Sequence, residues 1–171
     1  MKTVILLGVI VLQSLTCLAA TQKQGSFAIY LFASPVDTRS VKQQQWKNQP
    51  LASAPIISEA DILAYDFSKH ALKLRPEALK RLPLPPVEGT PFVVVVNGER
   101  IYWGAFYSNF SSIPFSLPVI LVNRGAQSET PGRDIVLIER AYPAQSAMGK
   151  DLRSDERVRD VLGKLKKLAA F

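Results

Sequence analysis

His70 is the only histidine in the chain and the first residue whose type could support catalysis or metal binding. A zinc site needs several imidazole, thiolate or carboxylate ligands that converge, and no HxxH-type spacing occurs here. Serine catalysis would need His70 beside a serine and an acid, but the G-x-S-x-G elbow is absent, and Asp66 is separated from His70 by a predicted turn. This pattern predicts a structural or exposed histidine and no metal.

Other patterns that carry chemistry are also missing from the sequence. Neither GxxxxGK[ST] nor GxGxxG occurs, so no glycine-rich loop is predicted to hold phosphate. The acidic residues are scattered singly, and their spacing does not indicate a pair of catalytic carboxylates. We therefore expect a non-enzymatic protein without a cofactor, and keep a small exported enzyme that uses His70 as an alternative.

An aromatic cluster supplies the candidate binding residues. Aromatic side chains dominate the binding energy of many protein interfaces. The sequence predicts that Tyr102 faces away from Ile101 and Trp103, and that the last three aromatic residues lie in a loop over residues 104–116, where not all can be buried. The alternative is that this loop folds back and caps the sheet. The candidate binding residues are Tyr102, Trp103, Phe106, Tyr107 and Phe110.

A β-hairpin must position this cluster. Residues 92–96 are apolar and mostly β-branched, which is typical of a buried strand, and residues 99–103 supply the return strand. Asn97 and Gly98 between them both tolerate the positive φ of a tight hairpin turn. Pro91 lacks an N–H and is predicted to begin the first strand.

The remaining pattern predicts an α+β fold with one mostly antiparallel sheet of about five or six strands and helices on one face. A short helix is expected to begin at residues 58–61, where Ser58 and Asp61 resemble a capping box. A C-terminal amphipathic helix is expected over residues 155–168, capped by Ser154. The other expected elements are strands at 26–33, 70–74, 117–122 and 135–139, a helix at 76–82 and a long loop at 34–53.

The N-terminus has the features of an export signal. Lys2 precedes nine apolar residues, 4–12. Ala20 is a small residue after which a signal peptidase could cleave the chain. We expect residues 1–20 to be a signal peptide and residues 21–171 a single domain that is periplasmic or extracellular. Cys17 does not have the usual lipobox spacing, so lipidation is not expected. The mature chain then contains no cysteine and has no disulfide framework.

The chain is basic, with 21 lysines and arginines, 14 acids and a formal net charge of +7. Residues 1–20 contain one basic and no acidic residue, so the mature chain would have a formal net charge of +6. The basic residues are dispersed, a pattern typical of a solvated surface. We expect no nucleic-acid partner and no transmembrane segment after cleavage, and leave open a weak contact of the C-terminal lysines with an anionic membrane surface.

Residues 55–122 resemble the periplasmic head domain of the SecD and SecDF protein-export subunits. That domain has a strand, a helix-starting segment and a proline-led hairpin with an Asn/Asp-Gly turn. The transmembrane helices of those subunits are missing here, and residues 103–112 replace a glycine-rich stretch. Because the family's head domain is thought to engage emerging polypeptide, the resemblance implies a free-standing protein- or peptide-binding module. The matching residues are Leu72, Leu74, Ala78, Leu79, Gly89, Pro91, residues 93–96, Asn97 and Gly98.

Overall fold

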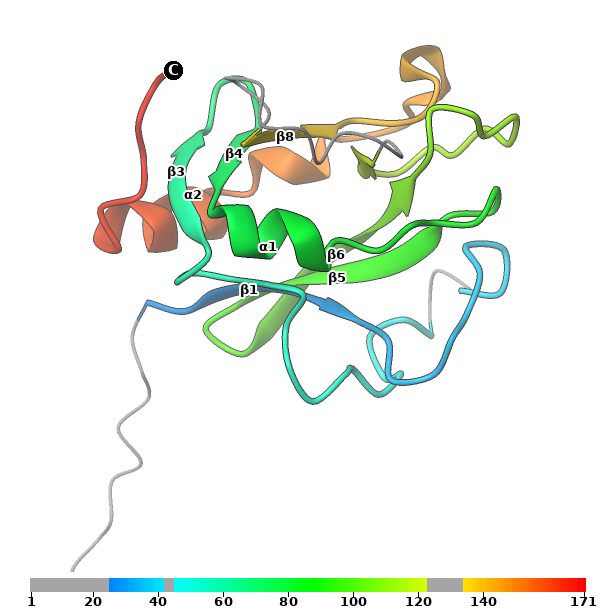
Figure 1. The fold of residues 1–171 in the computed structure, drawn as a ribbon, viewed down its shortest axis with the longest axis horizontal. Helices are drawn as coiled ribbons and strands as arrows, with labels where there is room; N and C mark the ends of the chain where they lie inside the picture. The colour runs from blue at the N-terminus through cyan, green and yellow to red at the C-terminus, as the bar shows by residue number, and fades with distance from the viewer. Residues whose placement is uncertain (1–24, 42–44, 123–133) are drawn as a thin grey trace, which may run out of the picture.

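The computed structural model describes residues 25–41, 45–122 and 134–171 (Figure 1). The predicted signal peptide, with Cys17, lies outside the described residues. The strands are β1 (Phe27–Leu31), β2 (Ile57–Ser58), β3 (Ile62–Asp66), β4 (Ala71–Leu74), β5 (Thr90–Val96), β6 (Glu99–Tyr107), β7 (Val119–Leu121) and β8 (Ile135–Glu139); the helices are α1 (Pro76–Arg81) and α2 (Glu156–Lys164), with short 3-10 turns at Ala144–Ser146 and Leu152–Ser154.

The eight strands form one sheet in the order β2-β1-β5-β6-β7-β8-β4-β3. Every neighbouring pair is antiparallel except β6 and β7, which are parallel. The predicted α+β class and the single, mostly antiparallel sheet are therefore confirmed. Between β5 and β6, Asn97 and Gly98 have φ values of 51° and 82°. These positive values place both residues in the conformation that a two-residue hairpin turn requires.

The helix predicted to begin at residues 58–61 is wrong, because this segment is a turn between β2 and β3. The Asp61 carboxylate accepts hydrogen bonds from the Ser58 backbone N–H and hydroxyl, both at 2.8 Å, and the Asp61 N–H donates to the Ser58 carbonyl. The same pair of side chains can cap a helix or close a turn. Here Ile62 already begins β3, so no residues remain for a helix.

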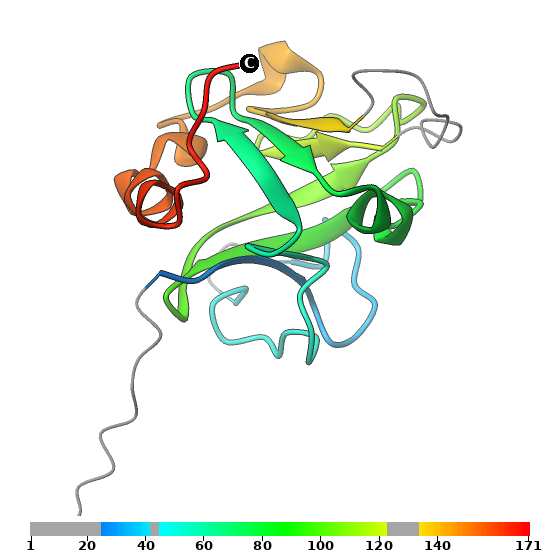
Figure 2. The same ribbon diagram turned by 60° about the vertical axis from the view of Figure 1, so that its left-hand side comes forward.

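This turn also determines the shape of the sheet. β2 and β3 lie at opposite ends of the strand order, yet only residues 59–61 separate them in sequence. The backbone from Ser58 to Ile62 can span at most about 14 Å. The sheet must therefore curl until its two outer strands approach each other, as Figure 2 shows.

Both helices pack into the concave side of the curled sheet. Ala78 of α1 belongs to the same buried core as Val158, Val161 and Leu162 of α2. Figure 2 shows the two helices on opposite sides of the sheet's interior, so each covers one of its two ends. The helix α2 buries those three apolar residues, while most of its charged residues are exposed.

The helix α2 is shorter than the predicted 155–168, and its cap is different. The Asp155 carboxylate, rather than Ser154, accepts a hydrogen bond from the Arg157 N–H at 3.0 Å. After the helix, Lys166 has a φ of 56°, and the chain turns to run beside β3. Tyr65 exchanges backbone hydrogen bonds with residues 167 and 169, and this pairing ends the helix early.

The convex side of β5 and β6 is covered by the long segment that follows β1. Trp46 is buried there against Val93 and Trp103. The Arg100 guanidinium of β6 donates to the Trp46 and Gln49 carbonyls at 2.5 and 2.7 Å. These bonds hold residues 45–49 on the sheet. Within the described residues, no helix has the length and apolar character needed to cross a bilayer.

Candidate functional site

The structure buries four of the five predicted binding residues. Tyr102, Trp103, Phe106 and Tyr107 are each at most 5% exposed, whereas Phe110 is 83% exposed. The prediction of an aromatic loop from residue 104 is wrong, because β6 continues to Tyr107. The four buried rings therefore build the domain, and only Phe110 is free to contact a partner.

Gly104 lies inside β6 at a place where the backbone of the segment leading into β7 approaches closely, an approach that glycine permits. A Cβ atom at this position would lie 2.2 Å from the Pro118 carbonyl oxygen, so any other residue would collide with backbone. Beyond Gly104, β6 pairs with β7 from Ala105–Val119 to Tyr107–Leu121. Because of this pairing with β7, β6 continues to Tyr107, beyond the predicted end of the strand at residue 103.

The buried aromatic rings divide between the two faces of the sheet. Phe106 points into the concave core and contacts Phe92, with ring centres 5.2 Å apart. Trp103 and Tyr107 lie on the other face, where both contact Phe115 at 5.5 Å. Trp103 does lie opposite Tyr102, as predicted, but Ile101 packs in the core with Tyr102. A register shift between β5 and β6 at Val94 and Val95 interrupts the simple alternation there.

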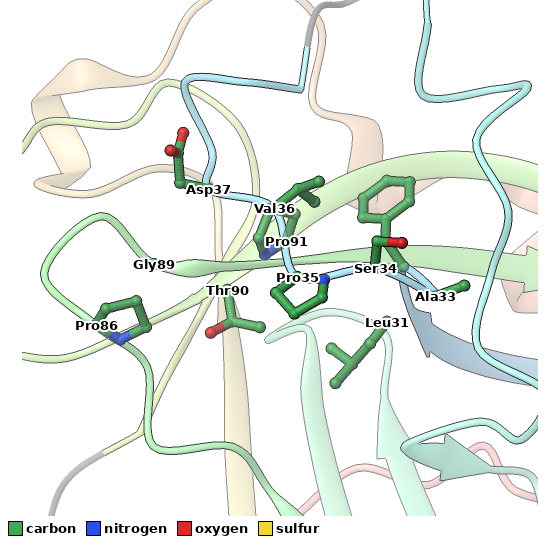
Figure 3. Close-up of a pocket in the computed structure, with 11 residues that line it drawn as sticks. Leu31, Ala33, Ser34, Pro35, Val36, Asp37, Pro86, Gly89, Thr90 and Pro91 are labelled. Carbon is green, nitrogen blue, oxygen red and sulfur yellow. The ribbon is translucent and has the colours of Figure 1, made fainter.

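An open cleft of about 480 Å³ lies at the end of the molecule where β1 and β5 separate. Figure 3 shows its side chains gathered around the start of β5. One wall comes from the chain that leaves β1 and the other from the chain that leads into β5. Most of the lining is apolar or proline. The lining residues are Leu31, Phe32, Ala33, Ser34, Pro35, Val36 and Asp37 on one wall, and Pro86, Gly89, Thr90 and Pro91 on the other.

Pro91 explains why the two strands separate at this place. The ladder between β1 and β5 ends at the pair Leu31–Phe92, so the next pair would join Phe32 to Pro91. Proline has no N–H to donate to the Phe32 carbonyl. On its other side the chain stays paired beyond Leu31, because Ala33 donates to the Pro50 carbonyl and Phe32 bridges Leu51. The cleft is thus a consequence of one interrupted strand ladder.

The two walls are joined beyond the cleft. The Thr38 hydroxyl donates to the Glu88 carbonyl at 2.6 Å, and the Arg39 guanidinium lies 3.3 Å from the Glu88 carboxylate. Gly89 lies directly above the Tyr107 ring, and a Cβ atom there would be 2.2 Å from a ring carbon. Tyr107, predicted as a binding residue, therefore supports the cleft from beneath.

The surface beside the cleft exposes three apolar side chains, namely Leu84 (57%), Val87 (50%) and Phe110 (83%). The Ser111 hydroxyl donates to the Val87 carbonyl at 2.6 Å, which fixes the loop that carries Phe110 against the second wall. The Ser108 hydroxyl accepts from the Phe110 N–H at 3.2 Å, a hydrogen bond typical of serine in turns. The loop conformation is thus held by side-chain hydrogen bonds that keep Phe110 in solvent.

The cleft lining contains one ionisable side chain, Asp37. Its carboxylate accepts from the backbone N–H groups of Ser40 and Arg39 at 2.8 and 2.9 Å. These hydrogen bonds, that of Ser40 first, lower the pKa of Asp37 below its ordinary value. Asp37 is therefore ionised at neutral pH and gives this rim of the cleft a negative charge.

His70 lies in a separate, buried polar cluster. Its Nδ1 is 3.2 Å from the Tyr65 hydroxyl and its Nε2 is 3.5 Å from the Ser154 hydroxyl. The sequence does not reveal this contact, because Ser154 lies 84 residues away from His70 in the chain. Burial, followed by the charge of Arg153, lowers the pKa of His70, so the imidazole is neutral at pH 7.

A serine–histidine contact would need a carboxylate to orient the imidazole for catalysis. The nearby carboxylates are already bound to other groups. Both Asp151 oxygens accept from the Arg153 guanidinium, at 2.9 and 2.6 Å. Asp66 accepts from Ser68, Lys69 and Phe171, and the Ser68 hydroxyl is the main reason that its pKa is lowered. The cluster thus has the hydrogen-bonding pattern of a structural histidine.

In the part of the chain that the structure describes, no three histidine, cysteine, aspartate or glutamate side chains converge as metal ligands. No family model, curated protein or solved structure matches this chain. The resemblance to the SecD head domain stays a prediction that rests on its own motifs.

Proposed function

We propose that the protein is an exported, non-enzymatic binding module that holds an apolar, extended segment of another polypeptide in the cleft between β1 and β5. The observation that carries this proposal is the position of the exposed side chains. Phe110, Val87 and Leu84 lie on the loops beside an open apolar cleft, and hydrogen bonds hold the Phe110 loop in place. Exposed apolar side chains gathered beside a cleft are a typical feature of interaction sites.

The size and lining of the cleft support a peptide ligand. A volume of about 480 Å³ lies in the range of ligand pockets, roughly 300–1,000 Å³. Burial of one exposed phenylalanine stabilises a complex by about 2 kcal/mol, and Phe110 could be covered without any change in the fold. The export features of residues 1–20 and the resemblance to a domain that engages emerging polypeptide support the same proposal.

The test is a fluorescence-anisotropy titration of the purified protein with a short, uncharged, fluorescein-labelled peptide of alternating valine and threonine that ends in phenylalanine. We expect micromolar binding that Phe110→Ser weakens by about tenfold. Met148→Ser is the matched control, because Met148 is 74% exposed but does not lie on the loop that Ser111 ties to Val87 beside the cleft. Absence of binding, or equal loss in both variants, would overturn the proposal.

A further inference from the structure

The connection between α1 and β5 is rich in proline, and its residues 82–87 read LPLPPV. Proline fixes its own φ at about −65°, and the residue before a proline avoids the helical region. Pro83, Pro85 and Pro86 together restrict residues 82–86 to extended backbone. Leu82, with a φ of −56° and a ψ of 138°, lies close to the polyproline II values of about −75° and 145°.

The backbone of this connection is hydrogen-bonded only at its two ends. The Leu82 N–H donates to the Leu79 carbonyl where α1 ends, and the Gly89 N–H donates to the Pro86 carbonyl at the turn into β5. Between these bonds, no backbone group of residues 83–85 has a hydrogen-bond partner among the described residues. A solvated backbone without internal hydrogen bonds is characteristic of polyproline II.

The connection exposes one apolar edge. A polyproline II helix has three residues per turn, so side chains three positions apart lie on the same edge. Leu84 (57% exposed) and Val87 (50% exposed) have this spacing. The connection is held from both sides, because Leu82 packs against the core and the Val87 carbonyl accepts from the Ser111 hydroxyl. The two exposed side chains are thus presented to solvent on a fixed, extended backbone.

We infer that residues 82–87 are a ligand for a protein domain whose binding groove is lined by aromatic side chains. Such domains bind Pro-x-x-Pro segments in the polyproline II conformation, because a preformed backbone loses little entropy on binding. Pro83 and Pro86 have this spacing, and Leu84 and Val87 supply the apolar contact surface. The inference goes beyond the proposed function and does not rest on it, since here the protein supplies the bound segment.

The first test is a calorimetric titration of the purified protein with an SH3 domain and a WW domain that bind proline-rich peptides. We expect micromolar binding to at least one of them, and about tenfold weaker binding by Leu84→Ser. Phe110→Ser is the matched control, because Phe110 is 83% exposed but lies outside residues 82–87, so it should keep full affinity. No binding to either domain, or equal loss in the two variants, would overturn the inference. Because Phe110→Ser is the variant expected to lose the peptide held in the cleft, the two proposals can fail separately.

The second test changes the backbone and keeps the Pro-x-x-Pro spacing. Pro85→Gly frees the φ of residue 85 and the conformation of Leu84, so we expect about tenfold weaker domain binding. Pro114→Gly is the control, because Pro114 is an exposed proline in another connection. Full affinity in a folded Pro85→Gly protein would contradict the inference. If Pro85→Gly fails to fold, synthetic peptides of residues 80–88 with and without the substitution decide, and equal affinities of the two peptides would contradict it.

Discussion

The His70 cluster and the cleft are the two regions in which the chain gathers side chains of functional interest, and they differ in what remains available. In the cluster, His70, Asp66 and Asp151 are all bound to neighbouring protein groups. In the cleft, mostly apolar side chains line an open volume, and Phe110 is exposed on a neighbouring loop. The polar side chains of the His70 cluster are thus hydrogen-bonded to protein groups, while leucine, valine and proline side chains line the open cleft.

The largest expected effect lies under the cleft wall. Gly89 has a φ of 83°, and its Cα lies against the Tyr107 ring. Gly89→Ala should lower the free energy of unfolding by about 3 kcal/mol, because strain at positive φ adds to a collision with a buried ring. Urea denaturation measures this loss.

Gly98→Ala is the control for the Gly89 variant. Gly98 has a similar φ of 82°, but an added Cβ would meet nothing within 4 Å. This variant should lose only about 1 kcal/mol. Equal losses in the two variants would mean that the Tyr107 ring moves freely, and would remove the argument that it supports the cleft.

A smaller loss of stability is expected for a substitution in the His70 cluster. His70→Ala removes a buried side chain that is hydrogen-bonded to Tyr65 and should cost about 2 kcal/mol of stability. It should leave peptide affinity unchanged, since His70 does not line the cleft. A loss of peptide affinity in a folded His70→Ala protein would break the distinction between the two regions.

His70 also predicts a pH dependence of stability. Its pKa is lower in the folded protein than in the unfolded chain, so the unfolded chain binds more protons as the pH falls. Stability should therefore decrease below about pH 6.5, the ordinary pKa of histidine. Thermal melts from pH 7.5 to 5.5 should show this decrease in the wild type and a flatter profile in His70→Ala. Identical profiles would contradict the assignment.

The smallest expected losses of stability concern two neighbouring polar residues, Asp155 and Ser154. Asp155→Ala removes the cap of α2 and should cost about 1 kcal/mol. Ser154→Ala removes an exposed hydroxyl whose contact with His70 is long, 3.5 Å, and should cost less than about 0.5 kcal/mol. Urea denaturation of both variants checks the order. A larger loss for Ser154→Ala would indicate that the cluster depends on this hydroxyl.

Local turn and strand chemistry predicted much of the fold. Asn97-Gly98 between two apolar runs indicated the β5–β6 pair, and the proline at Pro76 indicated the start of α1, because these signals act within a few residues. Errors arose where distant segments decide the structure. Ser58 and Asp61 form a turn because β3 begins at once, and β6 continues past Gly104 because β7 pairs with it.

The candidate site was predicted only in part for the same reason. Phe110 was identified from its residue type, but the burial of Phe106 and Tyr107 depends on strands that are distant in sequence. Pro91 was predicted to begin a strand. That it also opens a cleft could not be foreseen, because the consequence depends on which residue of β1 lies opposite.

The three-residue link between β2 and β3 has a further consequence for how the protein meets its neighbours in a crowded solution. An exposed strand edge can recruit the edge of another molecule and start aggregation. Here one outer strand, β2, has only two residues, and the other, β3, is paired through Tyr65 with the segment after α2. The curled sheet therefore presents little unpaired edge to its neighbours, a form of protection that requires neither a disulfide nor a partner subunit.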